Sequence, residues 1–187
     1  MNKATLRKQY LGKRAALSKK IHQEKSEAIA ELFFDNISLN NYKSLHTFLP
    51  IKKNLEVDTY LIIREVRKRY PKLGLVVPKI QDYGLEHYIL AQDTIIAPGP
   101  YSVPEPQGAE RFEEQQIDIV LVPLLVFDIR GHRIGYGKGY YDRFLAEHPE
   151  ALKVGLSLFA PVDQIPEVSL NDIALDMIIT PDECYRF

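Results

Sequence analysis

The sequence reads "IDIVLV" from Ile117 to Val122, a run that is apolar at every position except Asp118. Polar residues precede the run and Pro123 closes it. A strand with one solvent-exposed face alternates apolar and polar residues, whereas a strand covered by helices on both faces is continuously apolar. The run therefore predicts a central strand of an α/β fold, in which helices cover both faces of the sheet.

Short apolar segments alternate with helical segments on both sides of this run. Residues 1–35 predict two helices with Ser18 as an N-cap between them, and Asp58 is the expected cap of a third. We expect helices at 59–69 and 140–147 and strands at 44–49, 75–77, 86–90, 154–158 and 175–179, with the turn Asp82-Tyr83-Gly84 joining two of the strands. This alternation predicts a three-layer α/β/α sandwich.

Residues 97–114 interrupt the alternation with four prolines and two glycines. Strands of similar texture are predicted on both sides of this segment, so it does not separate two domains. A long segment of this kind inside a domain is more often a functional loop than a linker. We therefore expect one domain, residues 1–187, that carries a functional loop.

Composition and charge exclude several classes of protein. The 187 residues are 45% hydrophobic and 26% charged, which is typical of a soluble globular domain. The net charge of −1 gives no general reason to expect a nucleic acid or an anionic membrane as partner. Cys184 is the one cysteine and has no partner for an internal disulfide, and residues 1–5 lack the apolar core of a signal peptide. These features predict a cytoplasmic protein.

A second motif, "RIGYGKGYYDRF" from Arg133 to Phe144, places three glycines at alternate positions before a predicted helix. Glycine allows positive φ and close approach to the backbone, so successive amides can converge on an anion at a helix N-terminus. Lys138 and Arg133 add positive charge. The pattern fits neither the P-loop nor the dinucleotide fingerprint. A phosphate site and a plain strand-turn-helix connection both remain open.

Asp142 lies in the first turn of the predicted helix that follows the glycines. A carboxylate is favoured there by the helix dipole alone. Beside a bound phosphate, the same carboxylate could instead hold Mg²⁺, a cation often bound by one or two carboxylates together with substrate phosphates. The residue type and its position do not separate a capping role from a metal-binding role.

The longer stretch "VPLLVFDIRGHRIGYGKGYYDRFL", residues 122–145, resembles the signature of the 5-formyltetrahydrofolate cyclo-ligase family. The segments "KATLRKQYLGKR" at 3–14, "FLPIKKNLEVDT" at 48–59 and "ALDMIIT" at 174–180 resemble other parts of that family, in the right order. The resemblance implies an ATP- and Mg²⁺-dependent enzyme that converts 5-formyltetrahydrofolate to 5,10-methenyltetrahydrofolate and releases ADP and phosphate. It also implies a mixed α/β sandwich akin to sugar-phosphate isomerases and CoA transferases.

The resemblance further implies roles for particular residues. Ile51 and Glu56 would contact the folate, and Asp142 and Asp176 would hold the metal. The small-molecule folate is the implied partner, with no nucleic acid, membrane or obligate protein partner. One departure is Tyr136, where some members have arginine, which leaves the role of this position open. The residues that would contact ATP are Lys3, Arg7, Arg133, Ile134, Gly135, Tyr136, Gly137, Lys138, Gly139, Tyr140 and Tyr141.

Taken alone, several of these residues allow two interpretations. Lys3 and Arg7 share one helix face, so they are either a solvated basic end or a clamp for a polyphosphate. Glu56 is either an exposed glutamate before a helix or an acceptor for the donor groups of a pterin. Ile51 suits a wall for a flat ring or ordinary core packing. Asp176 interrupts an apolar segment, so its carboxylate needs a cation or hydrogen bonds.

Two rival functions follow from the same sequence. A sugar-phosphate isomerase or CoA-transferase-like enzyme of related fold would use no ATP. A non-catalytic nucleotide-binding regulator would keep the glycine motif without turnover. Glu56, Asp142 and Asp176 argue against the regulator, because nucleotide binding alone has less use for a folate contact.

Overall fold

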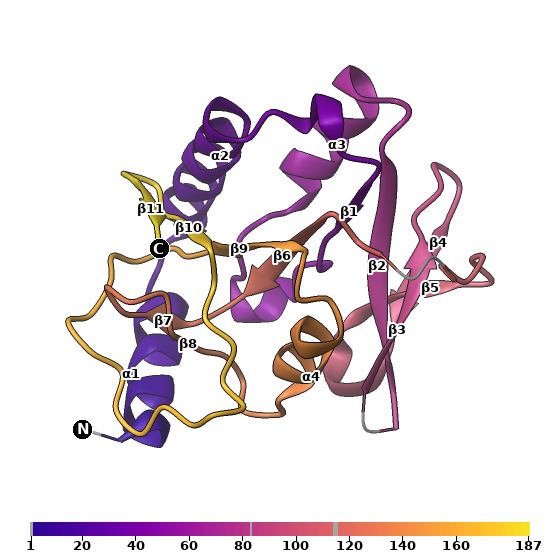
Figure 1. Cartoon of the computed structure of the whole chain (residues 1–187). Coiled ribbons are helices and arrows are strands. Elements are labelled where there is room, and N and C mark those ends of the chain that lie inside the picture. The colour runs from indigo at the N-terminus through magenta and orange to yellow at the C-terminus, as the bar shows by residue number, and fades with distance from the viewer. Residues whose placement is uncertain (1, 83, 114–115) are drawn as a thin grey trace.

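A seven-stranded sheet lies at the centre of this computed structural model, which describes residues 2–82, 84–113 and 116–187 (Figure 1). Met1, Tyr83 and Glu114, which some of the sequence predictions include, lie outside the described residues. The strand order is β11 (Cys184–Arg186), β10 (Met177–Ile179), β9 (Leu152–Leu156), β6 (Ile119–Pro123), β1 (Ser44–His46), β2 (Gly74–Gln81) and β3 (Gly84–Ile89).

The sheet is mixed. Strand β1 pairs in parallel with β2 and β6, and β9 pairs in parallel with β6 and β10. The edge strands β3 and β11 are antiparallel to their neighbours. The parallel strands are thus in the interior of the sheet, where helices can cover both faces.

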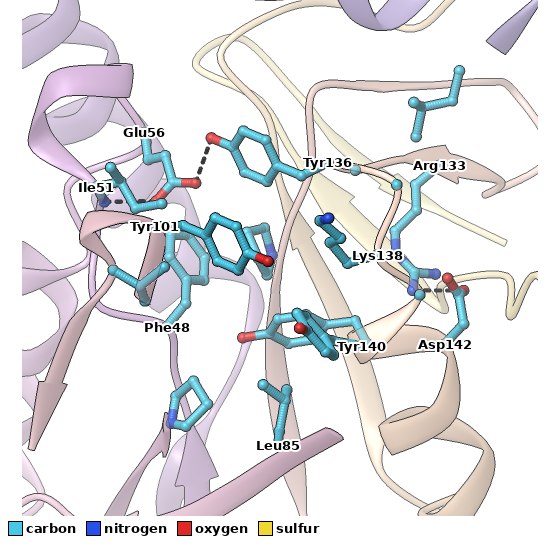
Figure 2. A pocket seen from close by; sticks show the side chains of 18 of the residues that line it. Phe48, Ile51, Glu56, Leu85, Tyr101, Arg133, Tyr136, Lys138, Tyr140 and Asp142 are labelled. Atoms are coloured by element: carbon cyan, nitrogen blue, oxygen red, sulfur yellow. Dashed lines mark hydrogen bonds and ion pairs between the residues drawn. The ribbon is translucent and has the colours of Figure 1, made fainter. Parts of the chain in front are cut away.

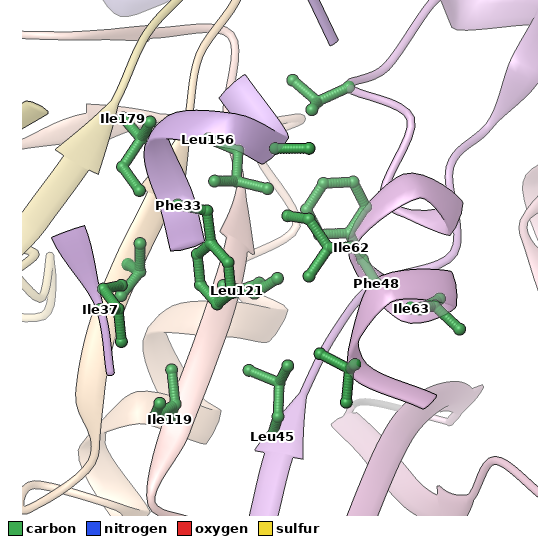
Figure 3. Packing of buried hydrophobic residues seen from close by; sticks show 14 of the residues in the cluster. Phe33, Ile37, Leu45, Phe48, Ile62, Ile63, Ile119, Leu121, Leu156 and Ile179 are labelled. Carbon is green, nitrogen blue, oxygen red and sulfur yellow. The ribbon is translucent and has the colours of Figure 1, made fainter. Parts of the chain in front are cut away.

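Strand β6 contains most of the apolar run and is buried on both faces. Ile119 and Leu121 pack in the larger hydrophobic cluster, beside Phe33 (Figure 3). Val120 and Val122 point to the other face and pack in a second cluster. Successive strand residues face opposite sides of a sheet, so a continuously apolar strand needs cover on both sides. The prediction from this run is confirmed.

Helices supply that cover. Helices α2 (Lys19–Asn36) and α3 (Tyr60–Arg69) pack on one face, and α4 (Tyr140–Glu147) packs on the other through Phe144 and Leu145 (Figure 1). The three-layer α/β fold is therefore confirmed, although the second face is covered by a single short helix and by loops. Among the described residues, no helix combines the length and apolar composition needed to cross a membrane.

Helix α1 (Lys3–Ala15) stands apart from the sheet. It packs against the hairpin of β7 (Val126–Phe127) and β8 (Arg133–Ile134), with Leu6 and Tyr10 in a third, smaller cluster. This docking brings the N-terminal helix to the start of the glycine motif, which follows β8.

The proline-rich segment forms a hairpin of its own. Strands β4 (Ile95–Pro98) and β5 (Pro104–Gln107) pair as a separate two-stranded sheet, joined by the short 3-10 helix η3 (Pro100–Ser102). Proline has no backbone N–H to donate, and it is tolerated in these strands because each strand has a paired neighbour on one side only. The segment that we predict to be a functional loop is therefore partly regular structure. Two other 3-10 helices are η1 (Leu39–Asn41) and η2 (Lys52–Asn54).

Element ends differ from the predictions in places. Ser18 caps α2 as predicted, by accepting from the amide of Ile21. Helix α3 begins after Thr59, and the Asp58 carboxylate accepts from the amide of Tyr60. Strand β1 ends at His46 rather than residue 49, and β10 begins at Met177 rather than residue 175. The last difference matters because Asp176 then precedes the strand instead of interrupting it.

Candidate active site

A cavity of about 610 Å³ lies beyond the carboxyl ends of β1 and β6. Phe48 and Leu49, which follow β1, line one side, and Pro123, the last residue of β6, lines another. The carboxyl ends of parallel strands are where α/β proteins place their ligand sites, and this volume is within the range for small molecules. The structure brings together here all of the predicted site residues except Asp176, namely Lys3, Arg7, Ile51, Glu56, Arg133, Ile134, Gly135, Tyr136, Gly137, Lys138, Gly139, Tyr140, Tyr141 and Asp142.

The glycine motif forms one wall of the cavity, between β8 and α4. Gly137 and Gly139 have φ of 86° and 68°, in the left-handed region that favours glycine. The amides of residues 136–139 donate no hydrogen bond to other residues within the described ranges. A strand-turn-helix connection alone would not need this run of unpaired donors, which suits an anion.

Arg7 lies against the glycine motif. Its Nε donates to the carbonyl of Gly135 at 2.9 Å, and a Cβ added to Gly137 would come within 2.9 Å of Arg7 Nη2. The absent side chain at Gly137 therefore makes room for the guanidinium. Helix α1 does reach the cavity, so the basic pair of Lys3 and Arg7 lines the site rather than forming a solvated helix end.

Two ion pairs hold the charged end of the cavity. The Arg133 side chain, 5% exposed, donates to Asp142 Oδ1 at 2.8 Å (Figure 2) and also to the carbonyl of Ile173. Lys3 pairs with Asp172. Partial burial acts to raise the pKa of Asp172, but hydrogen bonds from Lys3 and Ser169 outweigh it and hold the pKa below its ordinary value.

Asp172, not Asp176, is the second aspartate that lines the cavity, beside Asp142. Asp176 accepts from the amide of Lys153 at 2.7 Å and from its Nζ at 3.4 Å, near the amino ends of β9 and β10. The cavity lies at the opposite, carboxyl ends of the parallel strands. Asp176 thus has the cation and hydrogen bonds that its position demanded, but the structure does not place it with Asp142. The polar loop around Asp172 carried no sequence signal.

Apolar side chains and one carboxylate form the other end of the cavity. Its walls are Phe48, Leu49, Ile51, Pro78, Ile80, Leu85, Tyr101 and Val103. Leu55, in the left-handed conformation, ends η2 and turns the chain inward at Glu56. Ile51 contributes its amide as well as its side chain, because it donates to Glu56 Oε2 at 2.7 Å (Figure 2).

Glu56 is 5% exposed and is held on both oxygens. Tyr136 donates its hydroxyl to Glu56 Oε1 at 2.7 Å. Burial raises the pKa of Glu56 above its ordinary value, although the hydrogen bonds from Ile51 and Tyr136 and the charge of Arg14 partly oppose the shift. The interpretation of Glu56 as an exposed residue before a helix is therefore wrong.

The two adjacent tyrosines of the glycine motif divide their roles. Tyr141 packs against His46 and Phe144, and its buried hydroxyl has no hydrogen-bond partner among the described residues. Burial raises its pKa far above the ordinary value, so the hydroxyl keeps its proton. Tyr140 lies by the cavity (Figure 2), and the guanidinium of Arg143 lies over its ring. Across the mouth, Lys138 Nζ lies 5.2 Å from the ring centroid of Tyr101.

Comparison with known proteins gives consistent matches. The model of the 5-formyltetrahydrofolate cyclo-ligase family matches residues 1–181. A 5-formyltetrahydrofolate cyclo-ligase of Mycoplasma pneumoniae is 31% identical over 192 residues, which covers 97% of this chain and 100% of that protein. The plant mitochondrial enzyme of the same name, from Arabidopsis thaliana, is 26% identical over 89% of this chain and 69% of its own length.

Solved structures show the same similarity. The 5,10-methenyltetrahydrofolate synthetase of Aquifex aeolicus superimposes with a TM-score of 0.84 at 31% identity, and covers 100% of this chain and 93% of that one. The synthetase of Mycoplasma pneumoniae gives a TM-score of 0.76 at 28% identity, with 97% and 99% covered. The mixed sheet and its covering helices are thus the fold of these enzymes.

Proposed function

The chain belongs to the 5-formyltetrahydrofolate cyclo-ligase family and is an enzyme of that kind, and we propose that it uses ATP and Mg²⁺ to convert 5-formyltetrahydrofolate to 5,10-methenyltetrahydrofolate, with release of ADP and phosphate. One observation carries the proposal. A single cavity has unpaired amides and cations at one end and an apolar chamber that ends in a carboxylate at the other. Such a cavity suits two substrates that must meet.

The nucleotide would bind at the charged end. The amides of residues 136–139 would donate hydrogen bonds to the terminal phosphates of ATP, with the dipole of α4 behind them. Four cations surround the same space: Lys3, Arg7, Arg133 and Lys138. Arg133 and Lys3 are held by carboxylates before any substrate arrives, so part of the ordering cost of these long side chains is already met.

The carboxylates of Asp142 and Asp172 fit a magnesium ion. Each uses one oxygen for its ion pair, Oδ1 in Asp142 and Oδ2 in Asp172, and keeps the other for a metal. The described residues contain no group of three or more potential metal ligands, so substrate phosphates would complete the coordination, as is common for Mg²⁺. A bound Mg²⁺ would neutralise charge on the phosphates.

The folate would bind at the apolar end. Its flat pterin suits the chamber around Phe48 and Leu85, and Glu56 would accept hydrogen bonds from the amino group and ring N–H. Each Glu56 oxygen accepts one bond from the protein and has a second lone pair for the substrate. We propose this contact because a buried carboxylate with raised pKa is otherwise costly.

The chemistry needs no nucleophile from the protein. The oxygen of a formamide is a poor leaving group, and accepting the γ-phosphoryl group of ATP turns it into a good one. The lone pair of N10 then attacks the formyl carbon, the carbon–oxygen bond breaks, phosphate departs and N10 loses its proton. The residues of the cavity would act by holding the formyl oxygen in line with the γ-phosphate and by neutralising charge, which is the usual basis of phosphoryl-transfer catalysis.

The test is an absorbance assay. Purified protein is mixed with ATP, Mg²⁺ and 5-formyltetrahydrofolate, and the near-ultraviolet absorbance of the methenyl product is followed. We expect the absorbance to rise only when all components are present. A folded protein that produces no rise would overturn the proposal. ADP release that depends on the folate separates this activity from an ATP-independent isomerase or CoA transferase.

A further inference from the structure

A cation, a neutral hydroxyl and an anion are joined by hydrogen bonds at the wall of the cavity. Arg14 Nη1 donates to the hydroxyl oxygen of Tyr136 at 3.0 Å, and that hydroxyl donates to Glu56 Oε1 at 2.7 Å. Asn54 gives the same oxygen a weaker contact at 3.4 Å. Arg14 is 4% exposed and Glu56 is 5% exposed, so a buried cation and a buried anion are joined through one hydroxyl.

The hydroxyl group is the link that these two charges need. Among the described residues Arg14 forms no ion pair, and its other acceptor is the carbonyl of Leu124 at 2.6 Å. A buried charge without a counter-charge is expensive. Tyr136 therefore serves both ions, since a hydroxyl can accept from the guanidinium and donate to the carboxylate at once.

Tyr136 also belongs to both ends of the cavity. Its backbone lies in the glycine motif, between Gly135 and Gly137, while its side chain crosses to Glu56 at the apolar end (Figure 2). We propose that Tyr136, supported by Arg14, is a positioning residue that couples the two substrate subsites, so that a nucleotide bound at the glycine motif strengthens folate binding at Glu56. This inference rests on the proposed function.

The coupling follows from the amides that the nucleotide end leaves unpaired before binding. The amides of residues 136–139 have no partners in the described chain, so phosphate binding would order them. Ordering the backbone of Tyr136 makes the existing bond from its hydroxyl to Glu56 more persistent, which keeps the carboxylate oriented for the pterin. When the first ligand has already ordered these groups, the second ligand loses less conformational entropy on binding. The effect must be reciprocal, because it is a coupling free energy between two sites.

Calorimetric titration tests the coupling. The affinity for 5-formyltetrahydrofolate is measured without nucleotide and with a saturating non-hydrolysable ATP analogue and Mg²⁺. We expect the nucleotide to tighten folate binding by about 5-fold or more, within the usual range for coupled sites. In Tyr136→Phe the same nucleotide should change folate affinity less than about 2-fold, while the affinity for the analogue alone stays within about 3-fold, because the loop amides are retained.

Tyr70→Phe is the matched control. Tyr70 ends α3, stacks on Phe34 and does not line the cavity, so its variant should keep the full coupling. Equal coupling in Tyr136→Phe and the natural protein would overturn the inference, as would a natural protein that binds both ligands independently. If the natural protein does not bind 5-formyltetrahydrofolate at all, it is the proposed function that fails.

A second measurement separates positioning from general damage. The Tyr136 hydroxyl stabilises ionised Glu56, so its loss should move the midpoint of folate binding to higher pH. Arg14→Gln, which can keep a donor to Tyr136 but removes the charge, should shift the midpoint in the same direction. This variant also tests the inference if Tyr136→Phe does not fold. Weaker binding at every pH, with an unmoved midpoint in both variants, would contradict the positioning role.

Discussion

The guanidinium of Arg7 occupies the space that a side chain at Gly137 would fill. An added Cβ at Gly137 would lie 2.9 Å from Arg7 Nη2 and 3.0 Å from its Cζ. We expect Gly137→Ala to lower kcat/KM for ATP on the order of tenfold to a hundredfold, because Arg7 and the loop amides must shift. Its φ of 86° also predicts a loss of stability on the order of 1–3 kcal/mol. Steady-state kinetics and urea unfolding measure the two effects.

Variants of two other glycines serve as controls that distinguish backbone strain at Gly137 from the loss of its contact with Arg7. Gly108 has a φ of 61° but open space at its Cβ position, so Gly108→Ala should lose stability without losing ATP affinity. Gly12, in the same helix as Arg7, also has open space, and Gly12→Ala should gain about 0.5–1 kcal/mol. Equal kinetic losses in the Gly137 and Gly108 variants would show that the contact with Arg7 is irrelevant.

The choice between Asp172 and Asp176 can be made by titrating Mg²⁺. Asp142→Asn and Asp172→Asn should each raise the Mg²⁺ concentration for half-maximal activity by at least about tenfold, because each removes a charged oxygen from the proposed site. Asp176→Asn should leave this concentration unchanged. An Mg²⁺ requirement that moves with Asp176 and not with Asp172 would restore the pairing that the sequence resemblance implies.

Glu56→Gln should abolish folate binding and, relative to the natural protein, should become more stable as pH rises. The pKa of Glu56 is raised in the folded state. The contribution of this proton equilibrium to the free energy of unfolding is therefore fully present below the ordinary pKa of a glutamate, and it is lost as pH rises through the raised pKa. The stability of Glu56→Gln relative to the natural protein should therefore increase between pH 4 and pH 7. Folate binding should be lost at all pH values. Melting curves over this range check the trend, and a difference that is constant with pH would contradict it.

The buried His46 and the partly buried His87 predict the behaviour in acid. Burial lowers the pKa of His87 to about 4, with the charge of His148 as a smaller cause, and burial also lowers that of His46. The unfolded chain binds these protons more readily, so stability should fall as pH drops from the ordinary histidine value towards 4. His87 alone accounts for on the order of 3 kcal/mol of this loss.

His87→Phe should remove that part of the acid sensitivity. The ring of His87 stacks on Phe144 at 4.2 Å, so phenylalanine can keep the packing without the titration. Urea unfolding of the natural protein and the variant at pH 7 and pH 4.5 gives the comparison. The variant should lose less stability between the two pH values, and an equal loss would mean that His87 does not drive acid unfolding.

Local patterns predicted much of the fold. The run that contains Ile119–Val122 required cover on both faces, and helices α2 and α4 supply it. The bounds of α4 and the cap at Ser18 also follow from local chemistry, since each depends on residues within one turn. Strand ends were less predictable, because pairing with a neighbour decides where a strand stops.

The candidate site was predictable only in part. Glycine spacing pointed to an anion site from residues that are close in sequence. The pairing of Lys3 with Asp172 joins residues 169 positions apart, and Arg14 meets Tyr136 across 122 positions. Such contacts depend on how α1 docks on the β7–β8 hairpin, which no local pattern encodes. Asp176 interrupts a run of apolar residues, yet its carboxylate accepts hydrogen bonds from Lys153 away from the cavity.

The most direct measurement of the central claim compares two products in one reaction. ADP and the methenyl product are quantified together over a single course with 5-formyltetrahydrofolate, ATP and Mg²⁺. A cavity in which the γ-phosphoryl group activates the formyl oxygen predicts equal amounts of the two products at every time. Methenyl product formed without ADP, or ADP released at the same rate without the folate, would contradict the account.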